Sequence, residues 1–221
     1  MNSLGFSYNM NVSRAHIIML PGNEVSERLA TRCLASCISV GQQAEYYQAF
    51  DGTGDEIKTS ATDSWLKWIK VTDRYLSRTE IACALSHISL WAKCVEQDHP
   101  LIILEHDAIM VQAYPIHKVF NSIAYLGAKE QKEGWAVMPT PPHASNGHEY
   151  HFICRAHAYG IDPAVAKNML AHVIKYGIHE SLDMMLRADI FPIHQPGFYA
   201  YDEPGETTIT DRKKTPDGSE R

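Results

Sequence analysis

The sequence predicts a single α/β domain with a mostly parallel central sheet flanked by helices. Residues 15–20 form a short apolar run and residues 45–50 an aromatic-rich one, both typical of strands, and apolar side chains recur at helical spacing over residues 24–38 between them. A strand, a helix and a strand of these lengths indicate a parallel βαβ unit. Residues 101–104 are apolar at every position, which is typical of a central parallel strand with both faces buried.

The size of the chain fits one such domain. Its 221 residues can bury a full core, and 45% hydrophobic and 21% charged residues are ordinary values for a globular protein. We expect the domain to occupy residues 14–211. The polar residues 1–13 are expected to form a loose leader, and residues 212–221 are expected to form a flexible tail.

The bulk properties disfavour several classes of protein. A net charge of −6 without a long Lys/Arg run argues against a protein that binds nucleic-acid phosphates. No apolar run approaches the ~20 residues of a membrane-spanning helix, and the first residues lack the basic and apolar regions of a secretory signal. Five cysteines, an odd number without a regular framework, fit reduced thiols. These features together predict a cytoplasmic protein.

The clearest predicted helix begins directly after Ser77. Ser77 and Glu80 have the spacing of a capping box, in which each side chain satisfies a free backbone N–H group at the helix start. An apolar stripe at helical spacing follows, and Pro100 lies beyond the end of the helix. Residues 55–76, which precede this helix, fit either a short helix or an ordered loop.

The second half of the chain is expected to alternate strands and helices. The sequence predicts a helix over residues 115–126, strands near residues 135–138 and 190–194, and a strand pair or bent strand near residues 152–161. It also predicts a polar, Pro-rich lid or binding loop at residues 139–149. Asp162 as N-cap and Pro163 in the first turn predict a helix that Gly177 ends. Ser181 is the expected N-cap of a short helix over residues 182–187.

Two carboxylates directly after the buried strand are the sharpest chemical signal. Glu105 and Asp107 stand one residue apart at the carboxyl end of that strand, where open α/β sheets bind their ligands. Mg²⁺ and Mn²⁺ prefer oxygen ligands, and their sites combine one or two carboxylates with substrate phosphates. Such an ion acts as a Lewis acid for a departing diphosphate. Two acids that simply begin a loop would give the same pattern, so these residues alone leave both interpretations open.

Asp183 is the second candidate for a catalytic role. It lies in the first turn of a short predicted helix, where the helix dipole favours a negative charge, and it could also act as a general base toward an acceptor hydroxyl. Glu80, Ser86 and His87 share the long helix, and Glu80 and His87 lie two turns apart on roughly one face. The capping box already explains Glu80, and local hydrogen bonds would explain Ser86 and His87.

The sequence contains no zinc signature and no glycine-rich phosphate loop. Histidines cluster loosely over residues 143–157, but with the scattered Cys83, Cys94 and Cys154 they match no zinc-binding spacing. Residues 51–54 lack the spacing of a P-loop or of a Rossmann fingerprint. Zinc enzymes of the usual signatures and nucleotide-binding proteins of these two classes are therefore disfavoured.

These residues, in this order, resemble glycosyltransferase family 25, the lipopolysaccharide-type galactosyltransferases that include collagen galactosyltransferases. The resemblance is carried by the segments HIIMLPGNEVSERLATR, YYQAFDG, RTEIACALSHISLWAKCVEQDHPLIILEHDAIM and HAYGIDPAVAKNML, followed by SLDMML and GETTITDR. Together they span about residues 15–212. The third segment is the most specific, because it combines a Glu, a Ser-His pair, an aromatic-containing helix and a strand that ends in an acidic triplet.

The resemblance implies a GT-A-type nucleotide-diphospho-sugar transferase fold, a UDP-sugar donor and Mn²⁺ or Mg²⁺ as cofactor. It implies that Glu105 and Asp107 hold the cation and that Asp183 is the catalytic residue. We expect the donor nucleotide to lie over the N-terminal half of the domain. The expected donor-binding residues are Pro21, Gly22, Arg28, Asp51, Glu80, Ser86, His87 and His106.

One position departs from the family pattern. The acidic triplet of the family is usually Glu-Asp-Asp, whereas His106 stands at its centre in this chain. If the outer pair binds the metal, the exchange leaves the site intact. If the central position is a ligand, His106 either replaces a carboxylate or alters the metal dependence.

The predicted function is inverting transfer of galactose or glucose from a UDP-sugar to an acceptor hydroxyl, on a glycan such as lipopolysaccharide. A modified base in DNA and a protein side chain are alternative acceptors, and the acidic net charge disfavours DNA. A non-catalytic sugar-nucleotide-binding protein, with His106 as the mark of a decayed metal motif, is the alternative of a different class. A metal-dependent hydrolase would require a denser His/Asp cluster than the sequence contains.

Overall fold

A six-stranded, mostly parallel sheet forms the centre of the protein. The computed structural model describes residues 14–53, 66–72, 75–115, 121–127, 153, 155–202 and 208. In sheet order the strands are β2 (Ala44–Gln48), β1 (Ala15–Met19), β3 (Leu101–Glu105), β6 (Ala158–Ile161), β5 (Ile123–Tyr125) and β7 (Ile193–His194). Within this sheet β6 alone runs antiparallel to its neighbours. The predicted α/β class, the mostly parallel sheet and the parallel βαβ unit are therefore confirmed.

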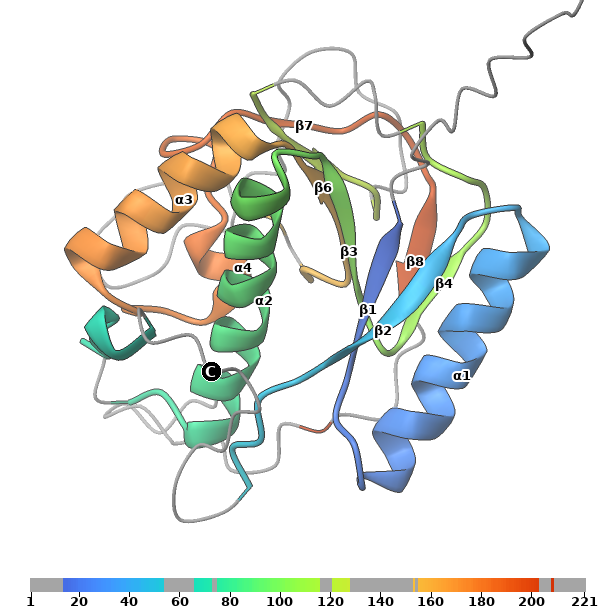
Figure 1. Cartoon of the computed structure of the whole chain (residues 1–221), viewed down its shortest axis with the longest axis horizontal. Helices are drawn as coiled ribbons and strands as arrows, with labels where there is room; N and C mark the ends of the chain where they lie inside the picture. The colour runs from blue at the N-terminus through green and yellow to red at the C-terminus, as the bar shows by residue number, and fades with distance from the viewer. Residues whose placement is uncertain are drawn as a thin grey trace, which may run out of the picture.

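Helices cover both faces of this sheet. Helix α1 (Glu24–Ser39) lies on one side, and α2 (Arg78–Gln97) and α3 (Pro163–Tyr176) lie on the other (Figure 1). The remaining described elements are the 3₁₀ turn η1 (Leu66–Trp68), the short helix α4 (Leu182–Met185), and a two-stranded ribbon of β4 (Ala108–Met110) and β8 (Ala200–Asp202). The ribbon packs into the same hydrophobic cluster as α1.

Strand β3 separates the two hydrophobic cores. Leu101 and Ile103 belong to the cluster shared with α2 and α3, and Ile102 and Leu104 belong to the cluster shared with α1. All four side chains are at most 2% exposed. Because side chains alternate between the faces of a strand, this explains why the segment is apolar at every position. The next residue, Glu105, continues the face that carries α2.

The predicted helix boundaries of α2 and α3 are confirmed by their caps. The N–H of Glu80 donates to Ser77 Oγ at 3.2 Å, and the N–H of Ser77 donates to Glu80 Oε2 at 2.9 Å. Asp162 Oδ1 accepts a hydrogen bond from the N–H of Val165, with Pro at the start of α3. Gly177 ends that helix with φ of 80°, in the region that favours glycine.

The predicted helix over residues 115–126 is wrong in its second half. Ile123–Tyr125 form strand β5, which pairs with β6 on one side and with β7 on the other. All three residues are buried. A short apolar run gives no periodicity that separates a strand from a buried helix turn, and here pairing with distant strands decides. The first half of the predicted helix, residues 116–120, lies outside the described residues.

Other predicted elements are confirmed in part. The short helix ends at Met185, and Ser181 occupies its N-cap position without capping it, since its hydroxyl donates to the Asp183 carboxylate instead. The last two predicted strands are shorter than expected, as the bounds of β6 and β7 show. The predicted leader, the strand over residues 135–138, the loop over residues 139–149 and the tail after residue 211 lie outside the described residues. Among the helices that are described, none has the length and apolar character needed to cross a bilayer.

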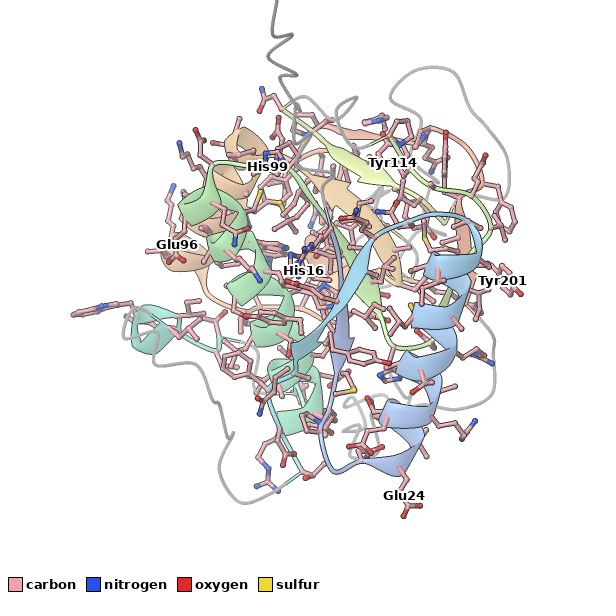
Figure 2. All side chains as sticks on the ribbon, turned by 45° about the vertical axis from the view of Figure 1, so that its right-hand side comes forward. His16, Glu24, Glu96, His99, Tyr114 and Tyr201 are labelled. Atoms are coloured by element: carbon pink, nitrogen blue, oxygen red, sulfur yellow. The ribbon has the colours of Figure 1, made fainter. Side chains whose placement is uncertain are left out.

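His16 on β1 is buried between the sheet and α2, as Figure 2 shows, and it is only 4% exposed. Its Nδ1 lies 3.1 Å from Glu45 Oε1. Burial, with a smaller contribution from the Lys93 charge, lowers the pKa of His16 from 6.5 to about 4, although Glu45 opposes the shift. The imidazole is therefore neutral in the folded protein at neutral pH.

We expect the folded state to lose stability as the pH falls from 6.5 to about 4, because the unfolded chain protonates His16 over this range and the folded chain does not. The loss attributable to His16 is up to about 3 kcal/mol. In His16→Gln this part of the pH dependence should disappear. Urea unfolding of both proteins at several pH values measures it, and parallel stability curves for parent and variant would contradict the assignment.

Candidate active site

A pocket opens at the edge of the sheet where β1, β2 and β3 end. Its volume is about 150 Å³. Since the three strands are parallel, their carboxyl ends meet at one edge, the lower edge in Figure 1, and the N-terminal half of α2 closes the side. The described lining residues are Ile18, Leu20, Ala49, Phe50, Gly52, Thr53, Thr79, Ala82, Cys83, Ser86, His87, Glu105, His106, Asp107 and Thr208.

The capping box and one small residue bring α2 to this edge. The cap fixes where α2 begins, so that residues 79, 82, 83, 86 and 87 form one stripe along the pocket. Ser86 Oγ accepts a hydrogen bond from the N–H of Phe50 at 2.9 Å and thereby ties the end of β2 to α2. A Cβ atom at Gly52 would overlap the carbonyl of Arg78, so only glycine permits this close approach.

Glu105 is held between the sheet and α2. Its N–H donates to His157 O at 2.9 Å, and its Oε1 lies 3.4 Å from Nε2 of the buried His87. Burial alone would raise the pKa of Glu105, but the hydrogen bond and charge of His87, with smaller effects of His157 and His106, lower it below its usual value. Glu105 is therefore an ionised carboxylate at neutral pH.

Asp107 lies in the turn after β3, and its surroundings raise its pKa, whereas those of Glu105 lower the pKa of that residue. Burial, and then the carboxylates of Glu105 and Asp202, raise the pKa of Asp107 to about 7. Its Oδ1 atom is buried and accepts no hydrogen bond from the described residues. A buried, unpartnered carboxylate oxygen beside a second carboxylate is costly unless a cation compensates the charge. Glu105 and Asp107 are therefore the residues that could hold a hard divalent ion.

His106 faces the opposite helix. Its Nδ1 lies 3.1 Å from Oγ of Ser26, a buried residue in the first turn of α1 whose Oγ also accepts the N–H of Leu20. Burial lowers the pKa of His106, with Glu105 opposing, so the ring is neutral at neutral pH. One ring nitrogen is thus already engaged by Ser26, which anchors the central residue of the triplet to α1.

Comparison with known protein families finds a match to part of this chain. The sequence model of glycosyltransferase family 25 (LPS biosynthesis protein) matches residues 27–135. This segment, just under half of the chain, is similar to glycosyltransferase family 25. No curated protein matches it. The family 25 match supports a glycosyltransferase activity, and it confirms the resemblance found in the sequence. The matched segment contains Glu105 and Asp107, whereas Asp183 lies beyond it.

Asp183, the predicted catalytic residue, lies beside the pocket and does not line it. Its Oδ1 accepts hydrogen bonds from Ser181 Oγ at 2.8 Å and from the N–H of Met184 at 3.1 Å. Burial raises the pKa of Asp183 above its usual value, the Ser181 hydroxyl opposes this, and the Glu105 charge adds to it. The effect of the Glu105 charge shows that Asp183 lies close enough to Glu105 for the two carboxylates to interact electrostatically.

The predicted donor-binding residues divide into two groups. Ser86, His87 and His106 line the pocket, and five others do not: Pro21, Gly22, Arg28, Asp51 and Glu80. Among the five residues that do not line the pocket, Gly22 and Asp51 make other hydrogen bonds at or near the same edge. Gly22 donates its N–H to Glu27 Oε1 at 2.7 Å, and Asp51 Oδ1 accepts from both the N–H and the hydroxyl of Thr53. Pro21 and Arg28 are exposed, and Glu80 serves the capping box.

The sequence does not predict Cys83 as a pocket residue. Cys83 lines the pocket one helical turn before His87. Burial, and then the charges of Glu105, Asp183, Asp107 and Glu80, raise the pKa of the Cys83 thiol well above its usual value. The spacing of four residues between Cys83 and His87 on one helix was the available signal. No matching zinc signature accompanies this pair in the sequence, so the spacing alone does not single it out.

Proposed function

We propose that this protein is a metal-dependent glycosyltransferase that transfers a hexose from a UDP-sugar to an acceptor hydroxyl, on a fold of the GT-A type. The observation that carries the proposal is the pair Glu105 and Asp107 at the carboxyl edge of the sheet, with Asp107 Oδ1 buried and without a hydrogen-bond partner among the described residues. The family 25 match over residues 27–135 supports the reaction class.

The donor set fits Mn²⁺ or Mg²⁺. Glu105 and Asp107 offer carboxylate oxygens, which these ions prefer, and the pKa of Asp107, raised to about 7, reflects a negative charge that a cation would stabilise. When bound, such an ion supplies Lewis-acid stabilisation of the diphosphate leaving group. His106 and Ser86 border the same space, and we expect them to contact the donor.

Asp183 is proposed as the general base. Its raised pKa brings it closer to the pH at which a carboxylate can accept the proton of an acceptor hydroxyl. Ser181 and Met184 both donate to Oδ1 of this carboxylate, and we assign the proton transfer to Oδ2. A base that activates the hydroxyl for direct displacement at the anomeric carbon gives inversion. Galactose or glucose is the proposed sugar, and a glycan such as lipopolysaccharide is the proposed acceptor.

A donor screen tests this function. The purified chain is incubated with UDP-galactose, UDP-glucose and other UDP-sugars, with and without Mn²⁺, and the released UDP is measured. We expect UDP release from at least one donor that Mn²⁺ stimulates and a chelator abolishes. UDP binding without turnover of any donor would instead support the non-catalytic sugar-nucleotide-binding protein.

A further inference from the structure

Cys83, His87 and Glu105 bring three different metal-ligand atoms together in the wall of the pocket. One ligand atom from each residue lies within 4.8 Å of the other two. Cys83 and His87 stand one turn apart on α2, and Glu105 faces them from the end of β3. All three side chains line the pocket, so an ion could reach them from outside.

His87 is already oriented as a metal ligand. Its Nδ1 lies 2.8 Å from the hydroxyl of Tyr159, on whose ring it stacks at 5.7 Å, and Trp91 Nε1 donates to the same hydroxyl at 2.9 Å. Histidine ligands usually have their second ring nitrogen in such a hydrogen bond, which fixes the ring. The other nitrogen, Nε2, is buried and points toward Glu105, with Oε1 of that carboxylate 3.4 Å away.

The distance between the His87 and Glu105 ligand atoms suits a tetrahedral ion. Nitrogen and oxygen ligands at about 2.0–2.2 Å from a tetrahedral zinc lie about 3.3 Å apart, and His87 Nε2 and Glu105 Oε1 are 3.4 Å apart. A thiolate and an imidazole select borderline ions such as Zn²⁺ over Mg²⁺ or Mn²⁺. Three protein ligands leave the fourth position open toward the pocket.

We propose that Cys83, His87 and Glu105 form a second metal site, selective for Zn²⁺ and similar ions, that competes for Glu105 with the ion of the transferase site. The carboxylates around Cys83, including Asp107 and Asp183, attract a cation to this place. When the ion binds, the Cys83 thiol loses its proton to solvent and the sulfur forms the metal bond. Zn²⁺ binding stands independently of the proposed function, whereas inhibition by Zn²⁺ rests on it.

Binding is tested by titration of the full chain with Co²⁺, a coloured substitute for Zn²⁺. We expect one equivalent of Co²⁺ to produce a thiolate-to-cobalt charge-transfer band in the near ultraviolet, which Zn²⁺ then removes. The band should vanish in Cys83→Ser and persist in Cys94→Ser, a matched exchange at a buried cysteine farther along α2. His87→Gln should weaken Co²⁺ binding at least about tenfold.

The result that overturns the site is the absence of the band in the parent, or its persistence in both Cys83→Ser and Cys83→Ala, with circular dichroism confirming that the variants are folded. Competition is tested by adding Zn²⁺ to the Mn²⁺-stimulated reaction. We expect at least about tenfold inhibition in the parent and less than about twofold in Cys83→Ser. Zn²⁺ binding without inhibition would overturn the proposed competition for Glu105. A chain that is inactive with every donor would refute the transferase function, and the Co²⁺ titration would still test the second metal site.

Discussion

Asp107→Asn is expected to lose about 100-fold or more of the Mn²⁺-stimulated sugar transfer, because in the proposed mechanism the ion stabilises the leaving diphosphate by several kcal/mol and each ~1.4 kcal/mol is a factor of ten. Asparagine keeps the shape of the side chain and removes its charge. Burial and the carboxylates of Glu105 and Asp202 raise the pKa of Asp107 to about 7, so the ionised form is unfavourable without a metal. The variant should therefore also have a higher Tm than the parent in chelator.

The measurements are initial rates over a Mn²⁺ concentration series and thermal unfolding in the presence of EDTA. Asp98→Asn is the matched control, since Asp98 caps the far end of α2 with φ of 47°, a conformation that asparagine tolerates. Asp98→Asn should leave the rate unchanged. An Asp107→Asn protein with the parental rate and the parental Mn²⁺ response would exclude Asp107 as a metal ligand.

Asp183→Asn is expected to reduce transfer by about 10²- to 10³-fold while the Kd for the UDP-sugar stays within about twofold, because the general base acts only on the acceptor. Asparagine can retain the Oδ1 atom that accepts from Ser181 and Met184, and it loses the second carboxylate oxygen. The fold around α4 should therefore be preserved while proton transfer is lost.

Calorimetric titration with the donor and single-turnover transfer separate these two effects. Asp189→Asn serves as the matched control, because Asp189 is exposed and pairs with Arg187. If Asp183→Asn transfers sugar at a near-normal rate with unchanged donor binding, the base must be sought elsewhere. The configuration of the product, read by NMR, tests inversion separately.

Local signals in the sequence predicted those parts of the fold that depend on neighbouring residues. The Ser77–Glu80 capping box is complete within one helix turn, so its pattern and its geometry coincide. The same holds for Asp162 and Pro163 at the start of α3. The strand β5 has no such signal, because Ile123–Tyr125 become a strand only through hydrogen bonds with β6 and β7.

In the site, the role of Cys83 likewise depends on contacts with distant segments that the sequence does not reveal. Its type and its spacing from His87 were visible, but a ligand set is recognised in sequence only when most of its members stand at a familiar spacing. The partner carboxylate comes from another element, β3, and the hydrogen bond that orients His87 comes from Tyr159 on β6. These contacts exist only after α2 packs on the sheet.

The sequence by itself determined that the segment Glu105-His106-Asp107 follows a buried strand at the ligand-binding edge of an α/β sheet, because an apolar strand and its end are local features. Only the tertiary structure decided what each side chain meets. Glu105 faces α2 and His87, whereas His106 faces α1 and Ser26. Glu105 is the last residue of β3 and continues the face of that strand, whereas His106 lies in the turn that follows. The helix that each side chain meets is fixed by packing between segments far apart in the chain.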